Sequence, residues 1–350
     1  MIRELTIENF RGFRRFEMRD LGLVNLIVGS NSSGKTSVLE ALHVLTSPGS
    51  LQAFCWIGSQ RGELNDVPNG GGIPVEFSHL FHGHQVVDTT SINLTYRGDN
   101  GDLTFTATPT SHPGAQIERD LKLSWNGSVQ QGPVITLPIS TTGVGKIGTD
   151  ALTWGERLFR NRSMFVTSAS LTARDAVDFF DAIVLSKEEQ LLTEALRAIN
   201  PQIQRVAPKH DYPFDHIRRG GFHVLLEGQP ISVPIGDLGD GIWRMLSLAL
   251  ALAMSANGVL LIDEIDTGLH FTVMDQMWQL ISAAAEKLNV QVFATTHSRD
   301  CVESLAVICH KDSPSEGRVS IQRIEPARGR SVSISEAEII AIAECGIEVR

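Results

Sequence analysis

Residues Gly29–Thr36 read G-S-N-S-S-G-K-T, a complete GxxxxGK[ST] phosphate-binding loop. The loop lies between an apolar run at 23–28 and a run with helical spacing at 38–45, and this strand–loop–helix context is what gives the motif its meaning. Glycines let backbone N–H groups close around phosphate oxygens, and the helix that follows points its positive end at the same anion. The stretch therefore predicts a nucleoside triphosphate site in an α/β fold.

The expected nucleotide contacts lie within or directly after this loop. Lys35 is expected to reach the β- and γ-phosphates, and the Thr36 hydroxyl is expected to hold Mg²⁺. The other predicted nucleotide-binding residues are Gly29, Ser30, Asn31, Ser32, Ser33, Gly34 and Ser37. A Gly/Ser-rich turn that matches by chance is the alternative, and the Lys–Thr pair with two correct flanks argues against it. ATP and Mg²⁺ are therefore the expected cofactors.

A second motif supplies carboxylates. Residues 259–264 read V-L-L-I-D-E, four apolar residues followed by two acids. A buried parallel strand delivers such acids at its carboxyl end, where α/β sheets bind ligands. Asp263 is then expected to hold Mg²⁺ through its water shell, and Glu264 to act as the catalytic base on the water that attacks the γ-phosphate. A buried strand that ends by chance in solvated acids is the alternative, and the complete phosphate loop in the same chain argues against it.

His297 ends another apolar pattern, at 288–298. A lone histidine at such a place is ordinarily a loop residue. Here the pattern predicts a strand that neighbours the strand of Glu264 in the same sheet. A neutral imidazole at that edge would either sense the γ-phosphate or orient the attacking water. His297 is therefore the second catalytic candidate beside Glu264.

Patterning along the chain predicts a nucleotide-binding core with two additions. The core is expected over 1–45 and 220–350, where strands alternate with helices as in a parallel sheet. Weak periodicity predicts a surface loop region at 46–75, and short alternating runs with turn signals then predict an antiparallel β subdomain, so that 46–155 is inserted in the core. Helical spacing predicts a helical lobe at 156–220. The expected fold is an α/β P-loop NTPase with a mixed or parallel central sheet.

The composition is globular with an acidic balance. The 350 residues include 30 Lys+Arg and 40 Asp+Glu, a net charge of −10. That charge gives no support for non-specific coating of nucleic acid, and leaves room for a local basic groove or for DNA held through a partner.

The longest apolar stretch, 245–256, is shorter than the about 20 residues that a membrane-spanning helix needs. Four cysteines without a CxxC pair fit a reducing cytoplasm, so we expect a cytoplasmic protein without a membrane partner.

Together these motifs resemble the ABC-type ATPase heads of the SMC/RecF/OLD superclass. The chain is most similar to stand-alone ATPases of the AAA_15 and AAA_21 kind near the OLD group, without a Toprim domain. Besides the phosphate loop and Asp263-Glu264, the matching segments are 7–13 (I-E-N-F-R-G-F), 238–241 (L-G-D-G, signature-like), 266–270 (D-T-G-L-H, D-loop) and 295–298 (T-T-H-S, switch). The likeness covers 1–45 and about 170–310 well, and the middle in outline.

The resemblance implies that two heads meet head-to-tail, with the signature segment of one head covering the ATP of the other. These roles fall to Gly239, Asp240 and Gly241 for the signature, and to Asp266 and Gly268 for the D-loop. The chain departs from transporter ATPases, whose signature is LSGGQ, because Leu238 precedes Gly239. Backbone contacts of the glycines are therefore implied, and hydroxyl contacts are not.

The resemblance further implies a Mg²⁺-dependent ATPase that forms a homodimer or higher oligomer and controls a separate effector protein, in prokaryotic defence of the anti-phage type. The alternative is a RecF-like DNA-repair ATPase that clamps DNA when ATP is bound, which the acidic charge does not favour. OLD nucleases carry a Toprim domain with a DxD set of metal ligands. No DxD follows His297 here, so any nuclease activity is expected from another chain.

Three features carry weaker predictions. The stretch 79–84 (H-L-F-H-G-H) suggests a metal site, but zinc needs a fourth ligand and rigid presentation, so we expect a partly exposed loop cluster. Trp243 and Arg244, beside the signature glycines, are candidates for the dimer interface. Arg11 either approaches the nucleotide or only stabilises its own turn.

Overall fold

The computed structural model describes the chain apart from residues 65–71, 112–117, 129–130, 149–162, 210–220, 312–316, 347–348 and 350. It has a mixed α/β fold divided into two compact units. The first unit comprises Met1–Gly22, Gly29–Asn161 and Gln322–Ser333, and the second comprises Leu23–Val28, Arg162–Ile321 and Ile334–Arg350. The phosphate loop therefore belongs to the first unit, and the Asp263-Glu264 pair to the second.

Most strands of the first unit pair antiparallel. They follow the order β2-β1-β5-β6-β7-β8-β9-β4 in the sheet. Their bounds are β1 (Ile2–Phe10), β2 (Phe13–Met18), β4 (Ile73–Glu76), β5 (Ile92–Gly98), β6 (Leu103–Ser111), β7 (Glu118–Gly127), β8 (Gln131–Ser140) and β9 (Val144–Ile147). The alternating runs that predicted antiparallel strands correspond to β5, β6 and β7, whose pairs are indeed antiparallel.

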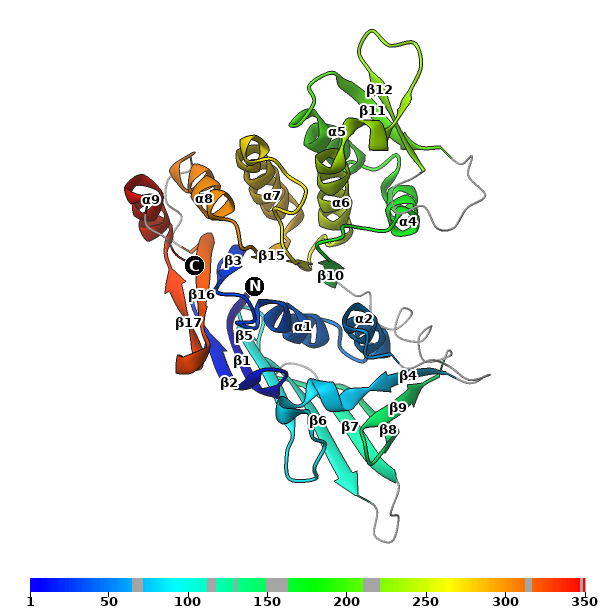
Figure 1. Ribbon diagram of the computed structural model, residues 1–350, viewed down its shortest axis with the longest axis vertical. Helices are drawn as coiled ribbons and strands as arrows, with labels where there is room; N and C mark the ends of the chain where they lie inside the picture. Colours follow the sequence, from blue (N-terminus) through cyan, green and yellow to red (C-terminus); the bar gives the residue numbers. More distant parts are fainter. Residues whose placement is uncertain are drawn as a thin grey trace. The chain divides into compact units, whose positions relative to one another are not determined.

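Two helices, α1 (Lys35–Thr46) and α2 (Leu51–Arg61), lie beside these strands (Figure 1). The side chain of Trp125, fully buried on β7, donates from Nε1 to the carbonyl oxygen of Val44 on α1 at 3.1 Å. A buried indole N–H needs such a partner. The antiparallel sheet therefore packs against α1, the helix that follows the phosphate loop.

The prediction of a surface loop at 46–75 is wrong for Leu51–Arg61, which form α2. Leu51, Phe54 and Gly58 are buried at helical spacing, but Gly and Ser residues interrupt the pattern and weaken the sequence signal. Residues 65–71 of this region lie outside the described residues, as do 149–162 and 210–220 of the predicted insert and lobe. The predicted domain boundaries remain predictions.

The second unit has a parallel sheet in the order β10-β14-β15-β3, with bounds β10 (Ser163–Val166), β14 (Val259–Ile262), β15 (Gln291–Thr295) and β3 (Val24–Val28). Four helices lie side by side along it in Figure 1: α6 (Asp240–Met254), α7 (Met274–Leu288), α8 (Arg299–Lys311) and α9 (Glu336–Cys345). All five residues of β3 and of β15 are buried, as in a sheet covered on both faces.

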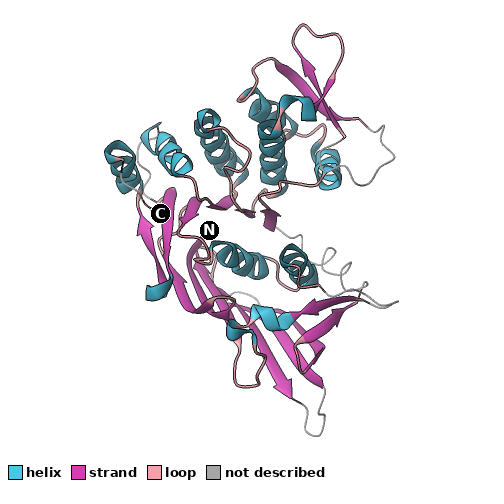
Figure 2. Cartoon of the chain, viewed as in Figure 1, coloured by secondary structure: helices cyan, strands magenta, loops and turns pink. Residues whose placement is uncertain are grey.

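Smaller elements complete this unit. They are α4 (Ala173–Ile183), α5 (Glu189–Arg197) and a separate antiparallel sheet of β11 (Ile203–Pro208), β12 (Phe222–Leu226) and β13 (Val233–Pro234), which Figure 2 shows in magenta among the helices. Two strands cross the boundary between the units along the chain, β16 (Val319–Glu325) and β17 (Arg330–Ile334).

The apolar stretch 245–256 lies mostly in α6, where every residue from Ile242 to Ala253 is buried. A helix that is apolar all round belongs in a core. Among the described residues, no helix has the length and hydropathy needed to cross a membrane.

Candidate active site

The phosphate loop leads into α1 through a glycine in the left-handed region. Gly34 is the N-cap of α1, with φ 97° and ψ 15°, and as a glycine it has no side chain with which to cap this helix end. A Cβ at Gly34 would lie 2.4 Å from the ring of Phe13, so only glycine fits there. A helix N-terminus left without a side-chain cap presents N–H groups that an anion can satisfy.

The rest of the loop is closely packed around its lysine. The Nζ of Lys35 donates to the carbonyl oxygens of Gly29 at 2.8 Å and Ser30 at 3.0 Å, which holds the ammonium over the loop. A Cβ at Gly29, where φ is 153°, would lie 2.8 Å from the Oγ of Ser33. That Oγ is itself buried and has no hydrogen-bond partner among the described residues. The loop thus fits an oxygen-rich anion, which would bring acceptors to the lysine and the serine hydroxyl.

The two predicted carboxylates follow β14 directly. The N–H of Asp263 donates to the carbonyl oxygen of Val166 on β10 at 2.8 Å, which continues the parallel pairing by one residue. Its Oδ1 accepts a 2.6 Å hydrogen bond from the Oγ1 of Thr295, and the same Oγ1 accepts from the N–H of Glu264 at 2.8 Å. Thr295 therefore orients both acids, a role that sequence reasoning missed although it included Thr295 in the switch segment.

Glu264 has a left-handed backbone, with φ 46°. This conformation is uncommon for a residue with a Cβ, and strained residues of this kind cluster at functional sites. The side chain is about half exposed, and its Oε1 lies 3.9 Å from the Nε2 of His297. The prediction that these residues lie on neighbouring strands is confirmed, because β14 and β15 pair in parallel. Their catalytic roles remain predictions.

The predicted signature and D-loop segments lie together in the second unit. Gly239, with φ 89°, is the N-cap of α6. A Cβ at Gly241 would lie 3.3 Å from the carbonyl oxygen of Gly268. A Cβ at Gly268 would lie 3.6 Å from the Cβ atom of Asp240. The D-loop is anchored to the switch segment, because Asp266 accepts a 2.5 Å hydrogen bond from the Oγ1 of Thr296.

Trp243 and Arg244 cannot form an exposed interface, and that prediction is wrong. Trp243 is 3% and Arg244 1% exposed, because α6 is buried from Ile242 onward. The Arg244 guanidinium donates to the carbonyl oxygens of Asp263, Glu264 and Ile265. Burial lowers the pKa of Arg244 to about 10, and the nearby charges of Asp266, Asp263 and Glu264 act in the opposite direction.

The Arg11 side chain pairs with two carboxylates of the first unit. Its guanidinium is buried and binds both carboxylate oxygens of Glu63, and its Nε donates to Glu40 on α1 at 3.0 Å. Burial lowers the pKa of Arg11, but the hydrogen bonds and charges of Glu63 and Glu40 outweigh it, so the pKa is raised overall. Of the two readings of Arg11, these contacts favour stabilisation of the turn.

The three histidines of 79–84 lie on short 3-10 turns, η1 (Phe77–Leu80) and η2 (His82–His84). The Nδ1 atoms of His79 and His84 are 3.2 Å apart, and the Nδ1 of His82 lies 3.0 Å from the carbonyl oxygen of Arg11. Each of the three imidazoles therefore has a hydrogen-bond contact within the first unit.

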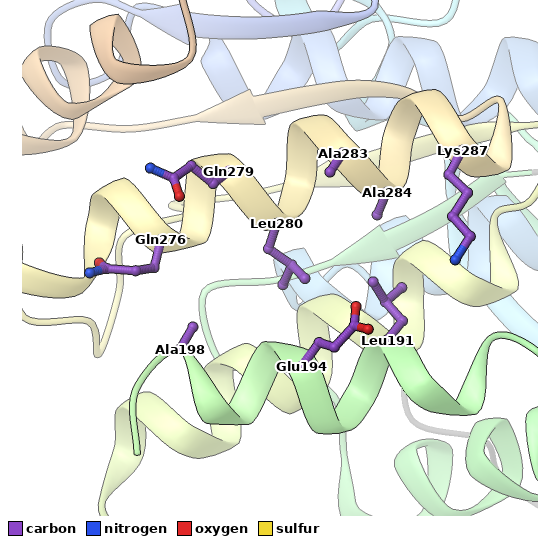
Figure 3. Close-up of a pocket in the computed structure, with 9 residues that line it drawn as sticks. All are labelled: Leu191, Glu194, Ala198, Gln276, Gln279, Leu280, Ala283, Ala284 and Lys287. Carbon is purple, nitrogen blue, oxygen red and sulfur yellow. The ribbon is translucent and has the colours of Figure 1, made fainter. Parts of the chain in front are cut away.

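A pocket of about 320 Å³ lies between α5 and α7 and contains none of the predicted site residues (Figure 3). Its lining consists of Leu191, Glu194, Ala198, Gln276, Gln279, Leu280, Ala283, Ala284 and Lys287. Its charged side chains are one cation, Lys287, and one carboxylate, Glu194, and much of the remaining lining is apolar. This lining does not suit a triphosphate, so we assign no nucleotide to the pocket.

Two protein-family models match the chain. Residues 1–96 match an AAA ATPase domain, and residues 135–300 match a model described as "AAA domain, putative AbiEii toxin, Type IV TA system". A curated ATP/GTP phosphatase of Helicobacter pylori is 25% identical over 351 residues, which cover 89% of this chain and 90% of the relative. The DNA replication and repair protein RecF of Xanthomonas axonopodis is 36% identical over 78 residues, 21% of each chain.

Solved structures of SMC head domains have the same fold. An SMC head bound to the C-terminal winged-helix domain of ScpA aligns with a TM-score of 0.52 at 13% identity, over 95% of this chain and 97% of that one. An SMC head with an extended coiled coil, bound to a ScpA domain from Pyrococcus furiosus, aligns with a TM-score of 0.51 at 12% identity, over 99% of both chains. The expected α/β fold is confirmed.

Proposed function

We propose that this chain, an ATPase of the SMC/RecF-like ABC type, hydrolyses ATP and that the residues that do so are those of its phosphate loop together with Asp263, Glu264 and His297. One observation carries the proposal. Three parallel strands of the second unit end at the same edge, because Ile262 on β14 pairs with Ala294 on β15 and Thr295 pairs with Ile27 on β3. The chain continues from these ends into the phosphate loop, the two acids and His297.

In the proposed reaction, Lys35 and the N-terminus of α1 hold the triphosphate. Glu264 accepts a proton from a water molecule while the oxygen of that water attacks the γ-phosphorus. The bond between the γ-phosphorus and the bridging oxygen breaks, which leaves ADP and inorganic phosphate. His297, 3.9 Å from Glu264, orients that water or senses the γ-phosphate. The half-exposed side chains of Glu264 and His297 leave room for the water.

The oxygen donors expected for Mg²⁺ are the Thr36 hydroxyl and the Asp263 carboxylate, which are the hard ligands this ion prefers. Mg²⁺, when bound, would neutralise charge on the β- and γ-phosphate oxygens. Thr295 would keep Asp263 oriented for this role through its 2.6 Å hydrogen bond. Removal of Mg²⁺ with EDTA is therefore expected to stop hydrolysis.

We further propose that a second copy of the chain completes the site through Gly239, Asp240 and Gly241. Asp240 and Gly241 lie against Gly268 of the D-loop, and Phe271, three residues after Gly268, carries an apolar side chain that is 59% exposed. A large exposed apolar side chain beside backbone-presenting glycines suits a surface that a partner covers.

The proposed output is control of a separate effector in prokaryotic defence. The description of the family model that matches 135–300 names a toxin–antitoxin system. The SMC heads that align with this chain are bound to ScpA domains in their structures. The four cysteines are all free, in support of a reducing cytoplasm. A RecF-like DNA clamp is the second candidate, supported by the RecF matches and opposed by the net charge of −10.

The decisive variant is Glu264→Gln, which keeps the size of the side chain and removes the base. Phosphate release is expected to fall by about 10²–10⁴-fold, and light scattering is expected to show an ATP-dependent dimer. Lys35→Ala, which loses triphosphate binding, is the control and should give neither hydrolysis nor the dimer. Unchanged turnover in Glu264→Gln would remove Glu264 from the mechanism. ATP-dependent, salt-sensitive DNA binding would favour the RecF-like candidate instead.

A further inference from the structure

We propose that Arg244 is a positioning residue that holds Glu264 in its strained conformation and ties it to the signature-like segment. The inference rests on the proposed hydrolysis, in which Glu264 is the base. The sequence suggested Arg244 only as a candidate for the dimer interface and gave it no role in the chemistry.

The guanidinium of Arg244 reaches three successive carbonyl oxygens of the loop after β14. Its Nη2 donates to Asp263 at 3.0 Å and to Glu264 at 2.8 Å, and its Nε donates to Ile265 at 3.3 Å. Its Nη1 donates to the carbonyl oxygen of Thr167, after β10, at 2.6 Å. One fully buried side chain therefore binds together the ends of two parallel strands.

This arrangement requires arginine. A buried cation normally pairs with carboxylates, whereas the hydrogen bonds of Arg244 go to backbone carbonyls and to the hydroxyl of Ser170. The planar guanidinium has five N–H donors in a fixed fork, and the ammonium of lysine has three donors on one atom. A lysine at this position cannot reach the same set of carbonyls.

The contacts act on a strained residue. A left-handed backbone at a residue such as Glu264 persists only where its surroundings impose it. Two side chains do so here: Arg244 binds the carbonyl oxygen of Glu264, and the hydroxyl of Thr295 accepts from its N–H. Without Arg244, the carboxylate of Glu264 loses its fixed direction toward the attacking water.

Arg244 also connects two functional segments. It follows the first turn of α6, three residues after Gly241 of the signature-like segment, and a Cβ at Gly241 would lie 3.3 Å from the carbonyl oxygen of Gly268 in the D-loop. A displacement of this turn by a nucleotide on a second copy would move the guanidinium and, through it, the backbone of Glu264. The physical link between the signature-like segment and the base is thus one side chain.

The test is Arg244→Lys in the full chain, compared with Ser170→Ala. The lysine keeps the charge and loses the fork, so kcat is expected to fall about 10-fold or more, as for other small displacements of a catalytic group. The Kd of a fluorescent ATP analogue should stay within about twofold, because the phosphate loop is not altered. Ser170→Ala removes only the weak 3.3 Å hydroxyl contact and should leave kcat near wild type.

A double variant separates positioning from general stability. If Arg244 acts through Glu264, then adding Arg244→Lys to Glu264→Gln will not lower the residual rate further, whereas independent losses would multiply. Arg244→Gln provides a second variant, and circular dichroism verifies the fold of each. A folded variant with wild-type kcat, or multiplied losses, would overturn the inference. Absence of hydrolysis in the wild type would instead count against the proposed function.

Discussion

The Oγ1 of Thr295 donates a 2.6 Å hydrogen bond to the Oδ1 of Asp263. Thr295 is the last residue of β15, and Asp263 is the first residue after the neighbouring strand β14, so one strand end orients the other. Thr295 is fully buried, and its hydroxyl also accepts from the N–H of Glu264. A single side chain thus serves both the residue expected to face Mg²⁺ and the residue expected to act as base.

Thr295→Val keeps the shape of this side chain and removes the hydroxyl. The N–H of Glu264 is then left without its acceptor, so the free energy of unfolding is expected to fall by about 1–3 kcal/mol. Phosphate release should fall about 10-fold or more, because both acids lose their orientation. Urea unfolding and steady-state kinetics measure the two effects. Thr295→Ser, which keeps the hydroxyl, is the control, and wild-type activity in the valine variant would contradict the assigned role.

Gly34→Ala tests the phosphate loop. The new Cβ would meet the ring of Phe13 at 2.4 Å, at a φ of 97° that alanine rarely adopts. The loop must therefore change shape, and the affinity for an ATP analogue should fall about 10-fold or more, since about 1.4 kcal/mol of strain is enough for that loss. Gly12→Ala is the matched control, because a Cβ there meets nothing within 4 Å. Equal affinities in the two variants would contradict the prediction.

Glu40→Gln tests the buried ion network of the first unit. Glu40 is 2% exposed and accepts from Arg11 at 3.0 Å and from Arg61 at 2.7 Å. Loss of one charge of a buried pair leaves its partner uncompensated, so the free energy of unfolding should fall by about 3–5 kcal/mol. The surface carboxylate of Glu17 provides the comparison, since Glu17→Gln should cost less than about 1 kcal/mol. Similar losses in urea unfolding would show that Glu40 contributes no more than a surface pair.

Acid should destabilise the chain through His43. Burial lowers the pKa of His43 on α1 to about 4, from an ordinary value of 6.5. The folded state therefore binds fewer protons than the unfolded state, and stability falls as the pH decreases from about 6.5 to about 4. A shift of this size corresponds to about 3 kcal/mol at most.

Urea unfolding of wild type and His43→Phe at pH 7 and pH 5 measures this contribution. The apolar ring cannot take up a proton, so the variant should lose less stability between the two pH values. A pH dependence identical in both proteins would mean that the buried imidazole does not contribute to acid sensitivity.

The sequence alone was sufficient for the local motifs. The phosphate loop, β14 with its two acids and β15 follow from apolar run lengths and from glycine spacing, which are properties of contiguous residues. The same reasoning failed at α2, where Gly and Ser residues mask the helical spacing of buried positions whose partners are distant in the chain.

Tertiary structure decided what the local pattern could not show. Arg244 looked like an exposed neighbour of the signature glycines, yet packing of α6 buries it beneath the loop of Glu264. The left-handed backbone of Glu264 and the double role of Thr295 likewise depend on contacts between strands far apart in sequence. The sequence by itself determined which chemical groups this protein has for the proposed hydrolysis of ATP. Only the tertiary structure decided how the acids are held, because hydrogen bonds to backbone groups on other strands exist only once the sheet has formed.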